Sequence, residues 1–395
     1  MRGQIIILYT YGLIFLLISV FLISCETDKT SLSSISQLPY SIPAQTDDGW
    51  ETASMQSVGM NVQPLMRLLS RLNGIGNHRI HSLLIIKNDK LVFEEYYPGE
   101  KFNLARYTGE TGFDMDDTHN LCSATKSFTS ALIGIAIDKG FIQSVNQSIF
   151  EYLSDYSDIL NTTPQKGAIT IEHLLTMTSG LEWDDETYPY SDPRNDMYQM
   201  FNSSDPIRYI LLKPLIEIPG TVFAYRNCNT NVLGAIVHQA SENRLDYFSG
   251  NYLFNKLEIR EFEWQMISQN VVFCSGDLRL RPRDMAKFGY LYLNGGMWKG
   301  ERIISQEWID LSIYKHISLT NSWGNLDGYG YQWWLWDNID GMEVNAYAAS
   351  GWGGQWIIVL PDYNAVFVTT GGNYYTPESI TIQSILVDYI IPAMN

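Results

Sequence analysis

Residues 61–96 change from helical to strand-like hydrophobic spacing. Apolar side chains at positions 62, 65, 68, 69 and 72 recur every three or four residues, which predicts an amphipathic helix that begins at Asn61 and ends at Gly74. Two apolar runs follow at residues 82–87 and 91–96, with Asn-Asp at 88–89 between them. Asn and Asp tolerate tight-turn geometry, so these runs are predicted to form a β-hairpin.

The C-terminal part of the chain returns to strand-like patterns. Apolar runs at residues 344–350, 355–360 and 365–370 predict three strands, with turn residues at 361–364, and an amphipathic helix is expected at about 377–391. The middle of the chain, roughly 125 to 270, has mostly helical and loop-like patterns. The expected fold is therefore α/β (α+β), with a mostly antiparallel sheet built from both termini, flanked by helices, and a largely helical subdomain at about residues 140–270.

The first residues have the layout of a secretion signal. Arg2 precedes an almost entirely apolar run over residues 5–22, and Leu-Ile-Ser-Cys follows at 22–25. This ending resembles a bacterial lipobox, which predicts a signal peptide over residues 1–24, a lipid on Cys25 and a flexible polar tether over residues 25–48. The alternative is an uncleaved membrane anchor. Either way we expect the protein in the cell envelope, attached to a bacterial membrane and facing the periplasm or the exterior.

Composition excludes several classes of function. The chain has 395 residues, of which 45% are hydrophobic and 17% charged, so it is long and apolar enough to fill a large core. Its formal net charge of −17 repels phosphate backbones and makes nucleic acid an unlikely partner in physical terms. With Cys25 lipidated, three cysteines are left, which argues against a disulfide framework. No zinc-binding motif occurs, and no metal or cofactor is expected.

The first candidate for chemistry is the segment Leu-Cys-Ser-Ala-Thr-Lys-Ser-Phe at 121–128, which precedes an apolar helix closed by Gly140. Ser123 and Lys126 lie three residues apart at the helix start and share a face. A desolvated Lys facing a Ser hydroxyl can take its proton, and the helix N-terminus favours a developing alkoxide. The alternative is a Ser that only caps the helix. A second Ser-x-x-Lys at 312–315 lacks an apolar helix after it, and we interpret it as surface.

Two further segments are polar or rich in glycine. Tyr225 and Asn227 lie in a polar loop before an apolar run, where a phenol near a Lys ammonium can act as a base. Gly351, Gly353 and Gly354 lie between two predicted strands, where they would let substrate approach an edge strand and leave backbone N–H groups for an oxyanion. A structural Tyr and a Gly-rich hairpin are the alternatives.

Taken in order, these segments resemble the serine β-lactamase and penicillin-binding-protein superfamily, in particular its class C-like branch. That branch includes carboxylesterases, D-amino-acid peptidases and 6-aminohexanoate-oligomer hydrolases. The segments at 169–181, 278–286, 301–305 and 328–334 also look like it, so the resemblance extends from about residue 50 to the end. It implies the β-lactamase/DD-peptidase-like fold for residues 49–395.

The resemblance also implies roles for the first two motifs. Ser123 becomes the acyl-accepting nucleophile and Lys126 its proton partner. Tyr225 becomes the general base, and Asn227 binds the substrate or orients Lys126. Arg226 departs from the family, which usually has a small residue at that position.

The third motif departs further. The oxyanion hole would be the backbone N–H groups of Ser123 and Trp352, with Ser350, Gly351 and Trp352 binding substrate. Lactamases of this superfamily carry Lys-Thr-Gly here, whereas this chain has Ala349 in place of the Lys.

Five residues near these motifs each allow a functional and a structural interpretation. Cys122 is either a rival nucleophile or a small buried filler, and the second is favoured. His173 is expected to pack at a helix start rather than to act in catalysis. Trp183 and Tyr331, like Trp352, either line the cleft or pack in the core.

The sequence thus predicts a lipid-anchored serine hydrolase that cleaves ester or amide bonds through an acyl-enzyme on Ser123. It is expected to prefer uncharged small-molecule substrates and to be poor on β-lactams, because Ala349 offers no positive charge for a substrate carboxylate. The alternatives are a true β-lactamase or D-peptidase, and, from another class, a non-catalytic binding lipoprotein on the same fold. The oligomeric state is left open.

Overall fold

The computed structural model describes residues 40–103, 106–319, 326–339, 341–374 and 380–394. Its largest feature is a nine-stranded sheet in the order β1-β3-β2-β18-β17-β16-β15-β14-β13. Neighbouring strands are antiparallel except for β1 and β3, which are parallel. The strands are β1 (Glu51–Thr52), β2 (Ile80–Lys87), β3 (Lys90–Tyr96), β13 (Ile317–Ser318), β14 (Gly328–Tyr329), β15 (Trp334–Ile339), β16 (Met342–Gly351), β17 (Gln355–Leu360) and β18 (Ala365–Gly371).

The pairing of β2 with β18 joins the two ends of the chain in one sheet, as the sequence predicts. The hairpin between β2 and β3 turns at Asn88 and Asp89, which both have left-handed backbones (φ 48° and 67°). This conformation suits a two-residue turn between twisted strands. The predicted α/β fold with a mostly antiparallel sheet is therefore confirmed.

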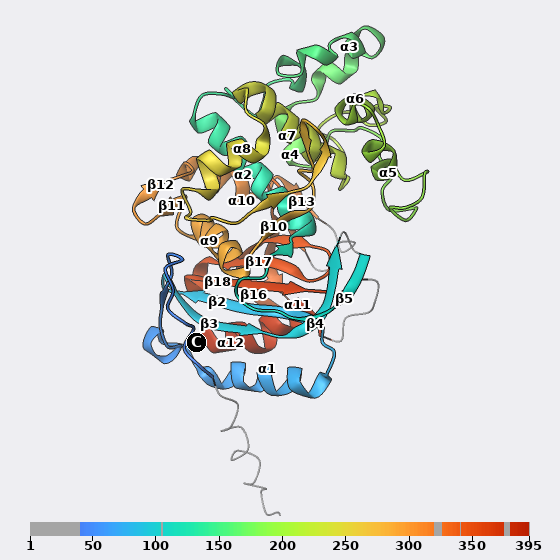
Figure 1. Ribbon diagram of the computed structural model, residues 1–395. Helices are drawn as coiled ribbons and strands as arrows, with labels where there is room; N and C mark the ends of the chain where they lie inside the picture. The colour runs from blue at the N-terminus through green and yellow to red at the C-terminus, as the bar shows by residue number, and fades with distance from the viewer. Residues whose placement is uncertain (1–39, 104–105, 320–325, 340, 375–379, 395) are drawn as a thin grey trace, which may run out of the picture. The chain divides into compact units, whose positions relative to one another are not determined.

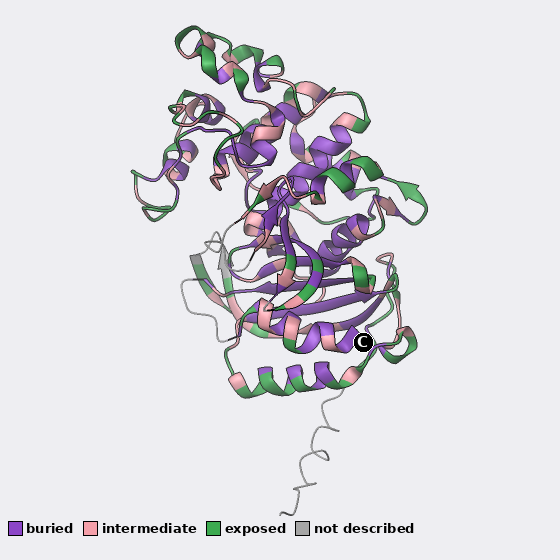
Figure 2. Ribbon diagram, turned by 180° about the vertical axis from the view of Figure 1, so that it is seen from behind, coloured by how far each residue is buried: buried purple, intermediate pink, exposed green. Residues whose placement is uncertain are grey.

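Helices cover both faces of the sheet. Figure 1 shows α1 (Val62–Ile75) and α12 (Ile391–Met394) on one side and α9 (Pro282–Leu293) on the other. Figure 2 shows that α1 turns its buried face toward the sheet and its exposed face outward, as amphipathic spacing requires. On the other side, α9 approaches closely at Gly289, where an added Cβ would lie 2.6 Å from the Val366 side chain.

The segment between α2 (Thr125–Asp138) and β10 (Leu278–Leu280) is mainly helical. Its longest helix, α7 (Asn227–Ser241), packs against α2, α4, α6 and α8. The other helices of this part are α3 (Asp158–Thr162), α4 (Ile171–Leu175), α5 (Asp196–Phe201), α6 (Pro206–Leu212) and α8 (Leu245–Ser249), followed by a π-helical turn at Gly250–Phe254.

Short strands and two further helices, one of them α11 (Ile382–Ile385), complete the strands and α-helices of the described residues. A three-stranded sheet has the order β6-β10-β7, and it brings the strand before Ser123 next to β10. These smaller elements are β4 (Pro98–Asn103), β5 (Arg106–Gly112), β6 (His119–Asn120), β7 (Glu263–Trp264), β8 (Met266–Ser268), β9 (Val271–Val272), β11 (Met297–Trp298), β12 (Glu301–Arg302) and α10 (Gln306–Ile313).

Some predicted boundaries need correction. The Asn61 side chain caps α1 by accepting from the Gln63 N–H at 3.0 Å. The helix continues past Gly74 to Ile75, and Gly76, whose φ is 76°, is its C-cap. Gly74 is tolerated there because a single helical Gly costs only about 1 kcal/mol relative to Ala. The described C-terminal helical segment begins at Ile382, and the predicted start at about 377 lies outside the described residues.

The end of the predicted tether also needs correction, because it is bound to the domain. The Arg283 guanidinium donates to the Ala44 carbonyl at 3.0 Å and to Asp48 Oδ2 at 3.0 Å. Tyr40 donates to the Val92 carbonyl at 2.8 Å. The polar composition of this stretch suggested a free linker, but a buried guanidinium needs acceptors and finds them here. The rest of the tether, the predicted signal peptide and Cys25 lie outside the described residues.

None of the helices within the described ranges combines the length and the apolar character needed to cross a membrane.

Candidate active site

Ser123 lies in a single 3-10 turn, Cys122–Ala124, that leads directly into α2. Cys122 has a left-handed backbone (φ 46°), an uncommon conformation for a non-Gly residue, and its N–H donates to Asn120 Oδ1 at 2.7 Å. One turn later, Lys126 Nζ donates to Ser123 Oγ at 3.0 Å and to the Ser275 carbonyl at 2.7 Å. The structure therefore brings together the Ser and Lys that the sequence paired.

Lys126 is almost fully buried, with 1% of its surface exposed. Burial disfavours the ammonium and lowers the pKa of Lys126 from 10.5 to about 7, although the nearby Asp185 carboxylate opposes this shift. A large fraction of Lys126 is then neutral at neutral pH. A neutral amine hydrogen-bonded to a hydroxyl can accept its proton, which is the arrangement expected for an activated nucleophile.

Tyr225 lies beside Lys126, whose Nζ is 4.9 Å from the centre of the Tyr225 ring. The ring stacks on Trp334 at 5.4 Å between centroids and an interplanar angle of 26°. Burial raises the pKa of Tyr225 well above its usual value, and a hydrogen bond with Ser123 only partly opposes this. The raised pKa favours the neutral phenol over a phenolate. The role of Tyr225 as general base stays a prediction.

Asn227 is held by a carboxylate that the sequence analysis missed. Its Nδ2 donates to Asp185 Oδ2 at 2.5 Å, and Trp183 Nε1 donates to the same oxygen at 2.8 Å. Asp185 is 8% exposed, and burial raises its pKa. Trp183 thus orients Asp185 from a buried position instead of lining the cleft. No motif spacing marks Asp185, which lies about 60 residues from Ser123 in a polar loop.

The third predicted segment, at the end of β16, packs against the turn that carries Ser123. A Cβ placed on Gly351, the last residue of β16, would lie 2.0 Å from the Leu121 carbonyl and 3.1 Å from the Ala124 nitrogen. Only Gly allows this approach, and it brings Trp352, the next residue, beside the Ser123 turn. Ala349 is fully buried, and Ser350 pairs with Trp356 within the sheet.

A cavity of about 310 Å³ opens beside this cluster. Ser123, Asn227 and Trp352 line it, and Trp352 is 40% exposed. Lys126 and Tyr225 lie behind Ser123 and are not among the described lining residues, nor are Ser350 and Gly351. Ser350 and Gly351 lie in β16, directly before Trp352, and their predicted contact with substrate stays a prediction.

The remaining candidates have structural roles. Burial raises the pKa of the Cys122 thiol to about 12, so it is a poor nucleophile. His173 caps α4 by accepting from the Thr170 N–H at 3.2 Å. Tyr331 is buried and donates to Glu172 at 2.8 Å. Among the described residues, the three cysteines after Cys25 are all free: Cys122, Cys228 and Cys274.

Arg226 and the second Ser-x-x-Lys motif both lie outside the described lining of the cavity beside Ser123. Arg226 forms an ion pair with Glu217 at 3.6 Å and is not among the described residues that line the cavity, so it does not replace the missing Lys of the third motif. The second Ser-x-x-Lys motif is only partly at the surface, which corrects the sequence interpretation. Ser312 is fully buried and donates to the Trp308 carbonyl at 2.7 Å, whereas Lys315 pairs with Asp337.

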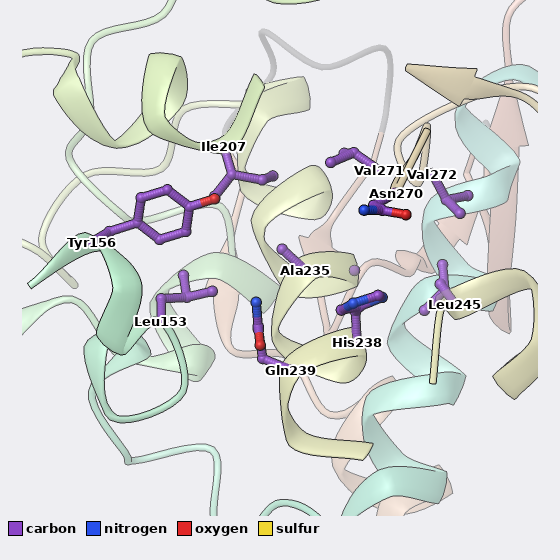
Figure 3. Close-up of a pocket in the computed structure, with 11 residues that line it drawn as sticks. Leu153, Tyr156, Ile207, Ala235, His238, Gln239, Leu245, Asn270, Val271 and Val272 are labelled. Atoms are coloured by element: carbon purple, nitrogen blue, oxygen red, sulfur yellow. The ribbon is translucent and has the colours of Figure 1, made fainter. Parts of the chain in front are cut away.

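A second cavity, of about 210 Å³, lies along α7 away from this cluster. Figure 3 shows side chains of α7 between Leu153 and Tyr156 on one side and residues 270–272 on the other. The described residues that line it include no Ser, Lys, Asp or Glu, so it offers no comparable nucleophile. Within the described ranges, no group of three His, Cys, Asp or Glu side chains is arranged to hold a metal ion.

The fold and the Ser-Lys-Tyr cluster define a serine hydrolase of the β-lactamase and penicillin-binding-protein type. The β-lactamase family model matches residues 67–377, and the chain belongs to this family. It is 27% identical over 278 residues to the 6-aminohexanoate-dimer hydrolase of Paenarthrobacter ureafaciens, covering 61% of this chain and 68% of that protein. This relative is named a hydrolase, and this chain is a serine hydrolase of the family.

Solved structures show the same fold. A putative 6-aminohexanoate-dimer hydrolase from Bacillus anthracis superposes with a TM-score of 0.66 at 23% identity, covering 83% of this chain and 81% of that one. A family VIII carboxylesterase superposes with a TM-score of 0.64 at 14% identity, covering 89% and 99%.

Proposed function

We propose that this protein hydrolyses ester or amide bonds of small molecules through an acyl-enzyme on Ser123. The observation that carries the proposal is the 3.0 Å hydrogen bond between Ser123 Oγ and a buried Lys126 whose pKa is lowered to about 7, at the edge of an open cavity. A capping Ser would not require a buried Lys, and burying that Lys costs stability. The cost is understandable if the pair serves catalysis.

In the proposed reaction, Lys126 accepts the proton of Ser123 as Oγ attacks the substrate carbonyl carbon. The backbone N–H groups of Ser123 and Trp352 stabilise the oxyanion, a role supported by the close approach of Gly351 to the nucleophile turn. The tetrahedral intermediate collapses, and the leaving group departs with a proton supplied by the Lys126–Tyr225 pair. Water then attacks the acyl-enzyme, releases the acid and returns the proton to Ser123.

The lack of a positively charged residue at position 349 of the third motif supports the proposal that β-lactams are poor substrates. Ala349 is buried and apolar, and Arg226 is engaged by Glu217. A substrate carboxylate next to the scissile bond would therefore lack a cationic partner. Losing one charge-assisted hydrogen bond costs about 1.5–3 kcal/mol, or roughly 10- to 150-fold in kcat/KM. We expect a cephalosporin to be hydrolysed with a lower kcat/KM than a short-chain p-nitrophenyl ester. A kcat/KM for the cephalosporin that matches or exceeds the kcat/KM for the ester would favour the alternative that the protein is a true β-lactamase.

The proposal includes a lipid on Cys25 that holds the enzyme at a bacterial membrane in the cell envelope, supported by the Leu-Ile-Ser-Cys ending at 22–25. Cys25→Ser should release the protein from membranes with unchanged kcat/KM. If this variant stays in the membrane fraction, the uncleaved-anchor alternative is favoured instead.

Labelling with a fluorophosphonate separates the hydrolase from a non-catalytic binding protein on the same fold. We expect one labelled serine in the wild type and no label in Ser123→Ala. Ser312→Ala is the matched control, because Ser312 occupies the second Ser-x-x-Lys motif, and it should label like the wild type. An unlabelled wild-type protein, or label retained by Ser123→Ala, would contradict the proposal.

A further inference from the structure

The cavity beside Ser123 is lined by aromatic rings from separate segments of the chain. Phe201 at the end of α5 meets Phe273 edge to face, with 5.0 Å between the ring centroids. The aromatic residues of the lining are Tyr190, Tyr198, Phe201, Phe273 and Trp352. The face of an aromatic ring carries partial negative charge and attracts cations, most strongly where water is excluded. The walls therefore favour a positively charged or flat apolar group.

The same cavity contains a buried carboxylate that the proposed mechanism does not use. Asp277 is 3% exposed, and its Oδ1 has no hydrogen-bond partner among the described residues. Arg279 Nε lies 3.5 Å from this oxygen, so the charge is partly matched but no hydrogen bond forms. Ser275 Oγ, in the same loop, is also buried without a partner among the residues described. Buried polar groups nearly always form hydrogen bonds, so Asp277 Oδ1, although it is ion-paired, and Ser275 Oγ can each still accept one.

The described residues that line the cavity include one ionisable acid, Asp277, and no Lys or Arg. Arg279, which is not among them, balances part of the Asp277 charge through the ion pair at 3.5 Å. Burial raises the pKa of Asp277 to about 6, which leaves the carboxylate mostly ionised above neutral pH. The chain as a whole has a net charge of −17, which adds a long-range attraction for cations.

We propose that this cavity selects esters or amides that carry an ammonium group, with the cation held between the aromatic rings and the Asp277 carboxylate. This inference rests on the proposed function and names its substrate class, and it replaces the preference for uncharged substrates that the sequence predicts. An ammonium supplies what the site lacks, because it pairs with the carboxylate and its alkyl or N–H groups contact the ring faces. The volume of about 310 Å³ is at the lower end for small-molecule sites, which restricts the class to short substrates.

Two matched substrate pairs test the proposal and show which side of the bond carries the cation. For the leaving group, acetylthiocholine is compared with 3,3-dimethylbutyl thioacetate, its uncharged isostere. For the acyl group, the p-nitrophenyl ester of 4-(trimethylammonio)butyrate is compared with that of 5,5-dimethylhexanoate. We expect the charged member of at least one pair to have a kcat/KM about tenfold or more above its isostere.

Asp277→Asn should remove most of that preference while changing kcat/KM for the uncharged ester less than about threefold. Asp116→Asn is the control for net charge, because Asp116 is an exposed carboxylate paired with Arg281 at 3.7 Å, and it should keep the preference. Phe201→Leu removes a ring without touching the charge, and it should weaken the preference even if Asp277→Asn folds poorly. Equal rates within both pairs, or an equal loss for charged and uncharged esters in Asp277→Asn, would overturn the proposal.

Binding of tetramethylammonium, measured by calorimetry, requires no turnover. Saturable binding to the wild type that is weakened at least tenfold in Asp277→Asn supports the proposal even if fluorophosphonate fails to label Ser123. No binding at 100 mM ligand overturns it, whether or not the enzyme hydrolyses neutral esters.

Discussion

The activity should follow the protonation of Lys126. Its amine is 1% exposed, donates to Ser123 Oγ at 3.0 Å, and has a pKa lowered by burial to about 7. Only the neutral amine can accept the Ser123 proton. With a pKa of about 7, roughly 1% of Lys126 is neutral at pH 5 and about 90% at pH 8. We therefore expect kcat/KM for p-nitrophenyl acetate to rise about tenfold per pH unit below pH 7 and to level off above pH 8.

A neighbouring charge offers a sharper test of the same reasoning. The Asp185 carboxylate stabilises the Lys126 ammonium, so it raises the pKa of Lys126 against the effect of burial. Asp185→Asn removes this charge and should move the midpoint of the pH profile to lower pH. Asp192→Asn, in the same loop but in an exposed pair with Arg194, should leave the midpoint unchanged. A profile that is flat from pH 5 to 9, or a midpoint that moves upward in Asp185→Asn, would refute the assignment of Lys126 as the base.

Three further outcomes are expected. Ser123→Ala should lose on the order of 10⁶-fold in kcat yet keep the melting temperature of the wild type within a few degrees, which calorimetry and kinetics together would check. Lys126→Ala and Tyr225→Phe should each lose nearly as much activity, and the double variant little more, because they transfer one proton as a unit; losses that multiply would show that they act independently. His81 and His119 are buried, and burial lowers their pKa values from 6.5 to about 3 and about 4. The unfolded chain therefore takes up these protons at a higher pH than the folded protein. The stability of the fold should be fully present above pH 6.5 and should fall as the pH drops toward 4. Thermal melts from pH 8 to 4 would contradict this if the melting temperature did not decrease.

Most of the sheet could be predicted because its strands are short, apolar and separated by strong turn residues. The residues at 88–89 turn the first hairpin through left-handed conformations that Asn and Asp tolerate. Residues 355–360 and 365–370 form β17 and β18 almost within their predicted limits. Local pattern is sufficient for such elements, since alternation and turn chemistry act within a few residues.

The candidate site could be predicted only where a motif carries it. Ser123, Lys126 and Tyr225 come from short motifs, and the fold brings them together. Asp185 and Asp277 come from loops, and their importance depends on burial and on which partners they lack, neither of which is visible in spacing. The raised pKa of Tyr225 could not be predicted for the same reason, because it comes mainly from burial in the folded protein.

Burial of Lys126 joins catalysis to stability in this protein. Lowering its pKa from 10.5 to about 7 corresponds to roughly 5 kcal/mol of disfavoured charge. The folded-state pKa lies below the unfolded value, so this cost is fully present below pH 7 and disappears as the pH rises toward 10.5. The hydrogen bonds to Ser123 and to the Ser275 carbonyl offset only part of it. A surface Lys would avoid the cost, but its pKa would keep it protonated at neutral pH and unable to take the Ser123 proton. The fold around the site, with the large sheet and the helices on both of its faces, has to offset the cost of keeping this buried base in place.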